Sequence, residues 1–322
     1  MPGPRVLFVK LSSLGDVIHH LPAVTDLAEN RPDARIAWAV EEAYADLVTM
    51  HPAVREAIPV GLRALRANPL APAAWRGMAR SRHAVRSRIW DFVVDTQGLA
   101  KSAVVARFAR APVFGLDAKS ARERMATRLY DVKIRVPRSL HAVERNRRLV
   151  GEVFGYAPQG EARYGLLRPD AAPDWVAGAR YVVMLHAASR AAKRWPEERW
   201  IELGRALASR GYVAVLPGGS AEEREAAKRL AASIPGAIAA PRVSLVDAAA
   251  LLAHAAGVIG VDTGLTHLAV ALDVPTVGIY CATDPALTGL HGAAHAVNVG
   301  GRGQVPGVEA VVAAIGIDGA PA

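Results

Sequence analysis

Between residues 180 and 280 the sequence alternates between short apolar runs and segments with the apolar spacing of helices. The apolar runs are rich in β-branched residues, which is typical of strands buried on both faces. Strict alternation with short connections predicts a parallel sheet that is covered by helices on both faces. The expected strands are residues 180–186, 212–216, 237–239, 257–261 and 276–280, and the expected helices are 197–209, 221–233, 245–254 and 265–272.

The first half of the chain shows the same alternation less regularly. The expected strands are residues 5–10, 35–40, 57–60, 91–95 and 113–116, and the expected helices are 17–29, 42–49, 120–130 and 141–150. Pro22 marks a break inside the first of these helices. Residues 61–90 form a basic, partly helical insertion, and residues 158–173, rich in Gly and Pro, are the candidate linker.

A length of 322 residues is typical of two domains. We therefore expect an α/β protein with an N-terminal Rossmann-like domain over residues 1–165 and a C-terminal one over 166–322. The two parallel sheets are expected to face each other across a cleft. Residues 305–316 predict a last helix, which can pack back on the N-terminal domain.

The net charge of +9 is unevenly distributed along the chain. Residues 1–160 hold 25 Lys and Arg against 15 Asp and Glu, a balance of +10, whereas residues 161–322 hold 14 against 15, a balance of −1. A basic N-terminal half indicates an anionic partner: a phosphorylated substrate, an anionic membrane surface or nucleic acid. A solvated basic face is the alternative. Nucleic acid is disfavoured because the few aromatic residues do not interleave with the basic ones.

Other features of the sequence concern the compartment. No apolar run reaches the length of about 18 residues that a membrane span requires, and the N-terminus shows no signal-peptide pattern. Cys281 is the single cysteine, so a disulfide framework is excluded and a reducing compartment is expected. We interpret Cys281 as a small buried apolar residue.

The stretch GVIGVDTGLTHLAVAL at residues 257–272 predicts a strand, a turn and a helix. In open α/β sheets, ligands bind in the crevice at the carboxyl ends of the strands. The first N–H groups of a helix and its dipole favour an anion at that point. Asp262 and Thr263 are equally suited to cap the helix.

Four further turns stand after predicted strands. In Ser12-Ser13-Leu14-Gly15-Asp16, Gly15 permits close approach of a substrate and Asp16 is a candidate general base or a helix cap. The neighbouring His19 and His20 complete no metal-ligand spacing. The other turns are residues 187–195 with Ser189 and Lys193, 217–220 followed by Glu222 and Glu223, and 283–285.

Several nucleotide-binding signatures are missing from the sequence. No G-x-G-x-x-G follows the first strand, so a nicotinamide or flavin enzyme is disfavoured, and no Walker A motif is present. No D-x-D pair is available to hold a divalent metal against a sugar nucleotide. We therefore expect a transferase of this kind to work without a metal cofactor, with Lys193 and helix N-termini meeting the charge of the leaving group.

The segments VKLSSLGDVIHHLPA, VDTQGLAKSA, SARER, HAVER, KRWPEERW, VDTGLTHLAVAL and TDP occur in this order along the chain. Together they resemble the ADP-heptose:lipopolysaccharide heptosyltransferases, glycosyltransferases of GT-B fold, over residues 5–290. SSLGDVIHHLP and SARER are more similar to the type I enzymes than to type II.

The resemblance implies transfer of L-glycero-D-manno-heptose from ADP-heptose to the first Kdo of Kdo2-lipid A, with inversion. By correspondence Asp16 is the general base, and Lys193 meets the leaving group. The donor is implied to bind at Ser189, Lys193, Glu223, Asp262, Thr263, Gly264 and His267. The chain has Ala188-Ser189 where the family carries two hydroxyl residues.

The basic half is expected to bind the acceptor and an anionic membrane surface. Arg63 and Arg66 would share one face of a helix, and the other acceptor candidates are Ser12, Gly15, Lys101 and Arg122. This predicts a peripheral protein on the cytoplasmic face of the inner membrane. The alternatives are a type II heptosyltransferase, a non-catalytic binder of anionic glycolipid, and a sugar-nucleotide epimerase.

Overall fold

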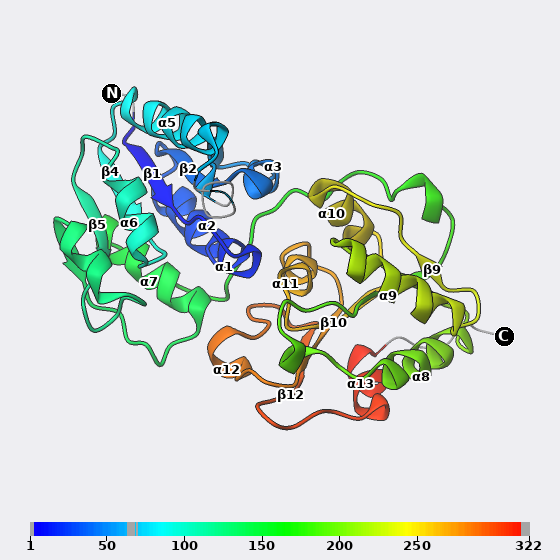
Figure 1. Ribbon diagram of the computed structural model, residues 1–322. Coiled ribbons are helices and arrows are strands. Elements are labelled where there is room, and N and C mark those ends of the chain that lie inside the picture. The colour runs from blue at the N-terminus through cyan, green and yellow to red at the C-terminus, as the bar shows by residue number, and fades with distance from the viewer. Residues whose placement is uncertain (1–2, 63–67, 69, 317–322) are drawn as a thin grey trace. The chain divides into compact units, whose positions relative to one another are not determined.

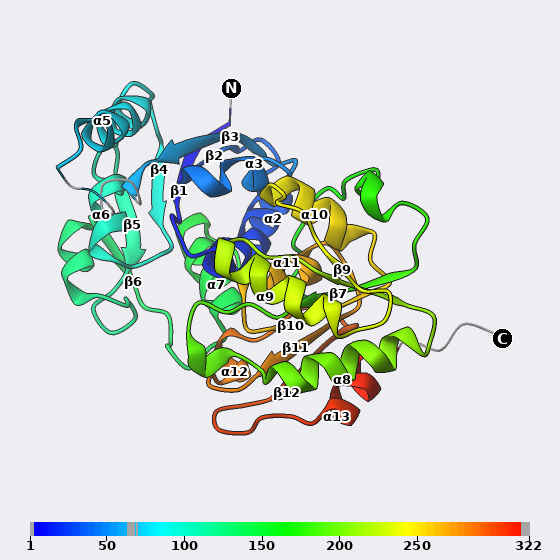
Figure 2. The same cartoon turned by 45° about the vertical axis from the view of Figure 1, so that its right-hand side comes forward.

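The computed structural model describes residues 3–62, 68 and 70–316. The chain divides into two compact units, Met1–Leu167 and Arg168–Ala322. Each unit holds a six-stranded parallel sheet (Figures 1 and 2). The strand orders are β3-β2-β1-β4-β5-β6 and β12-β11-β10-β7-β8-β9. These two sheets confirm the expected α/β class. No helix among the described residues is long and apolar enough to span a membrane.

The first unit alternates strands with helices on both faces of its sheet. Its strands are β1 (Arg5–Val9), β2 (Arg35–Glu41), β3 (Val54–Val60), β4 (Phe92–Asp95), β5 (Val113–Leu116) and β6 (Val132–Ile134). Its helices are α1 (Leu14–Ile18), α2 (Leu21–Asn30), α3 (Ala45–Val48), α5 (Pro72–Arg86), α6 (Ala100–Ala106) and α7 (Ala142–Phe154), with 3₁₀ turns η1 (Glu42–Tyr44) and η2 (Arg124–Leu129).

Burial in β1 shows how this unit is layered. Leu7 and Val9 join the apolar cluster on the face that α5 and α6 cover. Phe8 points to the other face, where its ring meets His20, which follows α1. Because both faces are buried, the strand is a continuous apolar run rather than an alternating one.

The second unit repeats this layout. Its strands are β7 (Tyr181–Leu185), β8 (Val213–Leu216), β9 (Ile238–Ala239), β10 (Gly257–Val261), β11 (Thr276–Tyr280) and β12 (Ala296–Gly300). Its helices are α8 (Glu197–Ala208), α9 (Ala221–Ala232), α10 (Leu245–Ala253), α11 (Gly264–Ala271), α12 (Pro285–Thr288) and α13 (Val308–Ile315), with 3₁₀ turns η3 (Asp174–Val176) and η4 (Ala191–Lys193).

The last helix, α13, packs within its own unit. It contacts α8 and strands β10, β11 and β12. Val311 and Ile315 are buried in the core between the sheet and α8. The second unit therefore buries the apolar side of this helix.

Other differences from the sequence predictions have local causes. The expected helix at 120–130 is instead a turn followed by η2, because Arg145 and Arg138 bind the carbonyl oxygens of Ser120 and Ala121. Strands β6 and β12 were not predicted, since they are edge strands without a continuous apolar run. The chain does break between α1 and α2, at His19 and His20, and Pro22 is the second residue of α2; α8 begins at Glu197, with Pro196 as its N-cap.

In each sheet, successive strands are added first on one side of the starting strand and then on the other, so the strand order reverses at the centre of the sheet. In the first unit this switch point lies between β1 and β4, and in the second between β10 and β7. The helices that follow two such strands lie on opposite faces, which leaves a crevice at the carboxyl ends where ligands bind.

Candidate active site

Asp16 lies beside the switch point of the first sheet, in the first turn of α1. Its Oδ2 accepts hydrogen bonds from the N–H of Ser13 at 3.1 Å and from the Ser13 hydroxyl at 3.3 Å. Nη1 of Arg122 lies 3.3 Å from Oδ1 and 3.2 Å from Oδ2. Asp16 thus does cap the helix, yet 24% of its side chain stays accessible to a substrate.

The charge of Asp16 is set by its neighbours. Burial by itself raises the pKa of this carboxyl, but the charges of Lys10 and Arg122 and the N–H of Ser13 outweigh burial and lower the pKa below its usual value. The carboxylate is therefore ionised at neutral pH and able to accept a proton.

Lys10, the last residue before this loop, is a buried cation that the sequence analysis did not single out. Its Nζ donates to the carbonyl of Thr96 at 2.8 Å and to Oδ1 of Asn146 at 3.1 Å. Asn146 in turn donates to the carbonyl of His19 at the end of α1. Burial lowers the pKa of Lys10 to about 8, although Asp16 acts against this decrease. The ammonium thus joins α7 to the helix that carries Asp16.

Gln97 holds the backbone of the loop between β1 and α1. Its Oε1 accepts from the N–H of Leu11 at 2.7 Å, and its Nε2 donates to the carbonyl of Ser12. The Gln97 backbone N–H donates to the buried Asp95, which also accepts from Ser102 and Tyr130. Burial raises the pKa of Asp95 despite these donors. The TQG turn after β4 is therefore the support of the Asp16 loop.

The acceptor candidates of the first unit are partly brought together. Lys101 donates to the hydroxyl of Ser12 at 3.0 Å, and Arg122 binds Asp16. Gly15 is the second residue of α1, directly before Asp16. Arg63 and Arg66 lie outside the described residues.

In the second unit, Lys193 and Asp262 meet across the switch point between β7 and β10. Nζ of Lys193 lies 2.7 Å from Oδ2 of Asp262. The Thr283 hydroxyl donates to the same oxygen at 2.7 Å, and Nε2 of His267 lies 3.6 Å from Oδ1. Burial raises the pKa of Asp262, but its bonds with His267, Lys193 and Thr283 lower it far below the usual range.

Asp262 and Thr263 do not cap α11 with their side chains, which was the alternative to a ligand site. Thr263 is the N-cap residue of α11, but its side chain makes no capping hydrogen bond. The carboxylate of Asp262 instead interacts with Lys193, Thr283 and His267. The start of α11 at Gly264 therefore keeps the N–H groups and dipole that suit an anion.

Glu223 has a structural role at the start of α9. Its Oε2 accepts from the N–H groups of Gly219 and Ser220 at 2.8 and 3.1 Å, and the Ser220 hydroxyl accepts from the Glu223 N–H. This reciprocal pair is a capping box at the start of α9. Glu223 thus caps the start of α9.

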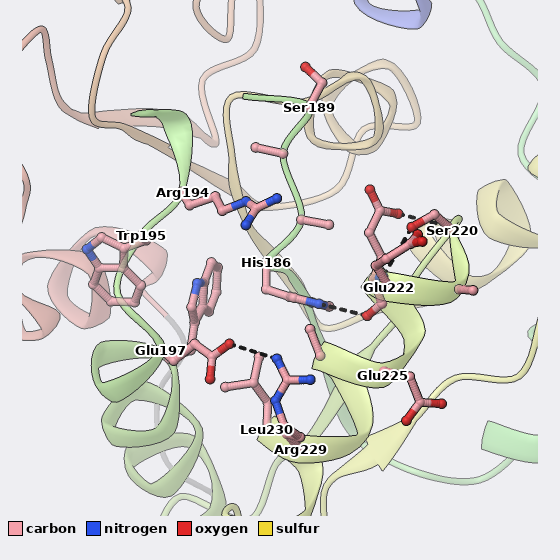
Figure 3. Close-up of a pocket in the computed structure, with 16 residues that line it drawn as sticks. His186, Ser189, Arg194, Trp195, Glu197, Ser220, Glu222, Glu225, Arg229 and Leu230 are labelled. Carbon is pink, nitrogen blue, oxygen red and sulfur yellow. Dashed lines mark hydrogen bonds and ion pairs between the residues drawn. The ribbon is translucent and has the colours of Figure 1, made fainter. Parts of the chain in front are cut away.

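A cavity of about 760 Å³ lies between α8, α9 and the loop after β7 (Figure 3). Ser189 stands at one end of it, and Glu197 pairs with Arg229 at the other. Of the donor candidates, Ser189 and Glu223 line this cavity. The lining residues are His186, Ala187, Ala188, Ser189, Arg194, Trp195, Glu197, Trp200, Ser220, Ala221, Glu222, Glu223, Glu225, Ala226, Arg229 and Leu230.

His186 extends from the end of β7 towards α9, as Figure 3 shows. Its Nε2 lies 3.3 Å from the carbonyl oxygen of Glu223, so this nitrogen carries the proton. Burial lowers the pKa of His186, which keeps the ring neutral. Within the described part of the chain, no group of three His, Cys, Asp or Glu side chains is placed to hold a metal ion.

The residues that the sequence did not reveal share one feature, their position in the chain. Lys10, Thr96 and Gln97 all follow the carboxyl end of a central strand, where the crevice forms. Nothing local distinguishes them from solvated loop residues, because their partners come from other strands and helices.

The sequence and the structure of the chain are similar to those of known proteins. Residues 78–311 match the model of glycosyltransferase family 9 (heptosyltransferase). Lipopolysaccharide heptosyltransferase 1 of Pseudomonas aeruginosa is 45% identical over 293 residues, which cover 89% of this chain and 81% of the relative. The structure of E. coli heptosyltransferase WaaC with ADP is similar with a TM-score of 0.88 and 37% identity, covering 96% of this chain and 98% of that one.

The similarity to type 2 enzymes is more limited. Lipopolysaccharide heptosyltransferase 2 of Salmonella typhimurium is 35% identical over 103 residues, which are 30% of this chain and 29% of the relative. Both sheets, the two switch-point clusters and the extent of these matches lead to one conclusion: the chain belongs to glycosyltransferase family 9, the heptosyltransferases.

Proposed function

We propose that this heptosyltransferase transfers L-glycero-D-manno-heptose from ADP-heptose to the first Kdo of Kdo2-lipid A in synthesis of the lipopolysaccharide inner core. One observation carries the proposal: each switch point holds a preorganised ionic group. In the first unit it is the ionised carboxylate of Asp16, and in the second it is the ammonium of Lys193 beside the start of α11. The first suits an acceptor hydroxyl, and the second suits a diphosphate.

The donor is proposed to bind at the carboxyl ends of β7, β8 and β10. Lys193 and the N-terminus of α11 at Thr263 and Gly264 would hold the pyrophosphate, with a hydroxyl contact from Ser189. Glu223 would hold the ribose, exchanging its bonds with Gly219 and Ser220. Asp262 and His267 would bind the heptose. The E. coli relative with 38% identity was solved with ADP-2-deoxy-2-fluoro heptose, which supports a donor of this class.

Transfer is proposed to be a single displacement. A Kdo hydroxyl oxygen attacks the anomeric carbon of heptose while its proton passes to Asp16. The bond from the anomeric carbon to the phosphate oxygen breaks, and ADP leaves with the electron pair. Attack opposite to the leaving group inverts the anomeric centre. Lys193 and the helix end stabilise the charge of ADP, so the reaction is expected to need no metal cofactor and to persist in excess chelator.

Acceptor binding is proposed to use the basic residues around Asp16. Arg122 binds this carboxylate and Lys101 binds the hydroxyl of Ser12 in the same loop, and the Kdo carboxylates and lipid A phosphates are suitable partners for both. Arg122 would release Asp16 as it binds the acceptor. Because this acceptor is anchored in lipid, the enzyme is proposed to work as a peripheral protein on the cytoplasmic face of the inner membrane.

Incubation of the protein with ADP-heptose and Kdo2-lipid A, followed by mass spectrometry of both, tests the proposal. One added heptose on the acceptor is expected, together with one ADP for each heptose transferred. A heptosylated acceptor as the preferred substrate would instead indicate type II. Epimerised donor without transfer would indicate an epimerase, and acceptor binding without any turnover would indicate a non-catalytic glycolipid binder.

A further inference from the structure

The longest acid-free stretch of the first unit surrounds α5. Between Glu56 and Asp91 the sequence contains seven arginines and neither an aspartate nor a glutamate. Most of the described part of this stretch is α5 itself. The proposed chemistry of heptose transfer makes no use of this helix.

One side of α5 anchors it to the first unit. Val85 and Ser81 are buried, and the Ser81 hydroxyl donates to the carbonyl of Pro59 in β3 at 3.0 Å. Figures 1 and 2 both show the helix along the outside of its sheet. Ser81 and Val85 of α5 therefore face the protein, and the opposite side of the helix is available to a partner.

The outward side of α5 carries four exposed arginines. Arg82 and Arg86 are one turn apart, as are Arg76 and Arg80. In the part of the chain that the structure describes, none of these four guanidinium groups takes part in an ion pair. Elsewhere in the same unit arginines do find carboxylates: Arg107 pairs with Asp131, for example, at 2.8 Å. Four uncompensated charges on one helix indicate an anionic partner.

Large apolar side chains accompany these charges. Trp75, in the second turn of α5, is 57% exposed, and Leu70, just before the helix, is 90% exposed. Ile89, just after it, is 73% exposed. Apolar groups of this size add nothing to binding of a phosphate backbone alone. At a bilayer surface, however, tryptophan lies at the headgroup level and arginines meet anionic lipids.

We propose that the outward side of α5, with Arg76, Arg80, Arg82, Arg86 and Trp75, is the surface that docks this protein on an anionic lipid bilayer. The inference rests on the proposed function, in which the acceptor is anchored in lipid. Binding through charge and one aromatic anchor is reversible and weakens with salt, because it buries no long apolar helix face.

Vesicle binding by the full-length protein tests the docking surface. The probes are sedimenting vesicles of phosphatidylcholine alone and of phosphatidylcholine with phosphatidylglycerol, at ~0.1 M salt. The wild type is expected to bind only the anionic vesicles. R76Q/R80Q/R82Q/R86Q is expected to bind them at least about tenfold more weakly, since each arginine near such a surface contributes roughly fivefold. Wild-type affinity in this variant would overturn the proposal.

A matched variant controls for net charge. R110Q/K133Q/R135Q/R148Q removes four exposed charges of the same unit away from α5 and is expected to retain binding within about twofold of wild type. An equal loss in both variants would show that total charge, and not this helix, attracts the protein. Loss of duplex DNA binding in the α5 variant with unchanged vesicle binding would identify nucleic acid as the partner.

Tryptophan quenching tests the anchor. Phosphatidylcholine brominated on its acyl chains, mixed with phosphatidylglycerol, is expected to quench wild-type emission, and Trp75→Phe is expected to remove that quenching. Its persistence in Trp75→Phe would overturn the anchoring role.

A soluble acceptor separates docking from catalysis. With Kdo2-lipid A stripped of its acyl chains and without vesicles, the α5 variant is expected to keep kcat/KM within about twofold of wild type. If the wild type itself does not transfer heptose but still binds anionic vesicles through α5, the proposed function fails and the docking surface stands. A tenfold loss of soluble turnover in the variant would instead assign these arginines to the acceptor site.

Discussion

At the scale of single residues, the carboxylate of Asp16 has two roles. Asp16 closes the first turn of α1 through Ser13, and its ionised state makes it a proton acceptor. Capping and catalysis do not exclude each other here, because the Ser13 bonds both end on Oδ2, while Oδ1 has, among the described residues, only its longer contact with Arg122. Substitutions can therefore separate the two roles.

Asp16→Asn is expected to lower kcat by roughly 10²–10⁴-fold while the KM for ADP-heptose stays within about twofold, because the amide cannot take up the acceptor proton. The amide oxygen can still accept from Ser13, so thermal denaturation should show a stability change of no more than about 1 kcal/mol. Steady-state kinetics with an ADP-release assay measures both constants. Unchanged kcat would remove Asp16 from the mechanism.

Lys10→Met is expected to raise the pKa of Asp16. The charge of Lys10 opposes the effect of burial on this carboxyl, so its loss leaves burial less compensated. The acid limb of kcat/KM, which reports the ionised base, should then move to higher pH. Lys101→Met is the control, since that ammonium bonds Ser12. An acid limb at the same pH in Lys10→Met would show that Lys10 has no influence on the base.

Lys193→Ala is expected to raise the KM for ADP-heptose and to lower kcat, each by roughly tenfold or more, because the leaving diphosphate loses its cation. Asp262 would also lose its partner at 2.7 Å and repel the donor. Lys193→Arg keeps the charge and should retain part of the activity. If both variants bind and turn over the donor as the wild type does, the phosphate site lies elsewhere.

At the scale of elements, the arrangement of β10, the turn after it and α11 depends on close approach of the helix to the strand at Gly260. A Cβ on Gly260 would lie 2.3 Å from Oγ1 of Thr266 and 2.8 Å from Cβ of Leu185. The Thr266 hydroxyl in turn donates to the carbonyl of Val261 at 2.7 Å. The helix can therefore sit on the strand only where no side chain intervenes, and this contact fixes the position of Asp262.

Gly260→Ala is consequently expected to lower the free energy of unfolding of the second unit by about 2–3 kcal/mol. Gly257→Ala, in the same strand, is the comparison: there the new Cβ meets the end of the flexible Ile315 side chain at 3.1 Å, and a loss below about 1 kcal/mol is expected. Urea denaturation measures both. Equal losses would mean that the approach of α11 is not what constrains the strand.

At the scale of the whole molecule, buried histidines couple the first unit to pH. The N–H of Ala53 donates to Nδ1 of His51, so Nε2 carries the proton and donates to Thr25 at 2.9 Å. Burial lowers the pKa of His51 to about 4 and that of His20 well below its usual value. The unfolded chain therefore binds more protons than the folded unit once the pH falls below about 6.5.

The stability that these neutral histidines contribute is thus complete above about pH 6.5 and is lost as the pH falls towards 4. His51 alone is expected to account for about 2 kcal/mol between pH 7.5 and pH 5. Hydrogen exchange of the amides in β1 and β2 follows this unit separately. His51→Gln should reduce the pH dependence by that amount, and an unaltered dependence would assign it to other groups.

Local patterns in the sequence were sufficient to predict two α/β units with parallel sheets, because fully buried strands and amphipathic helices have distinct apolar spacings. They also placed Asp16, Lys193 and Asp262 in turns at the ends of strands. Only the tertiary structure decided which turns meet. Strand order sets β10 beside β7, and so joins Lys193 to Asp262.

Two other contacts likewise depend on partners from distant elements. They are the hydrogen bonds of Gln97 to the loop after β1 and those of the Lys10 ammonium near Asp16. Such pairings form when long-range packing brings strand ends together, and no short stretch of sequence encodes them. The sequence by itself therefore determined the elements and the chemistry available at their ends, and the fold determined which of these groups act together.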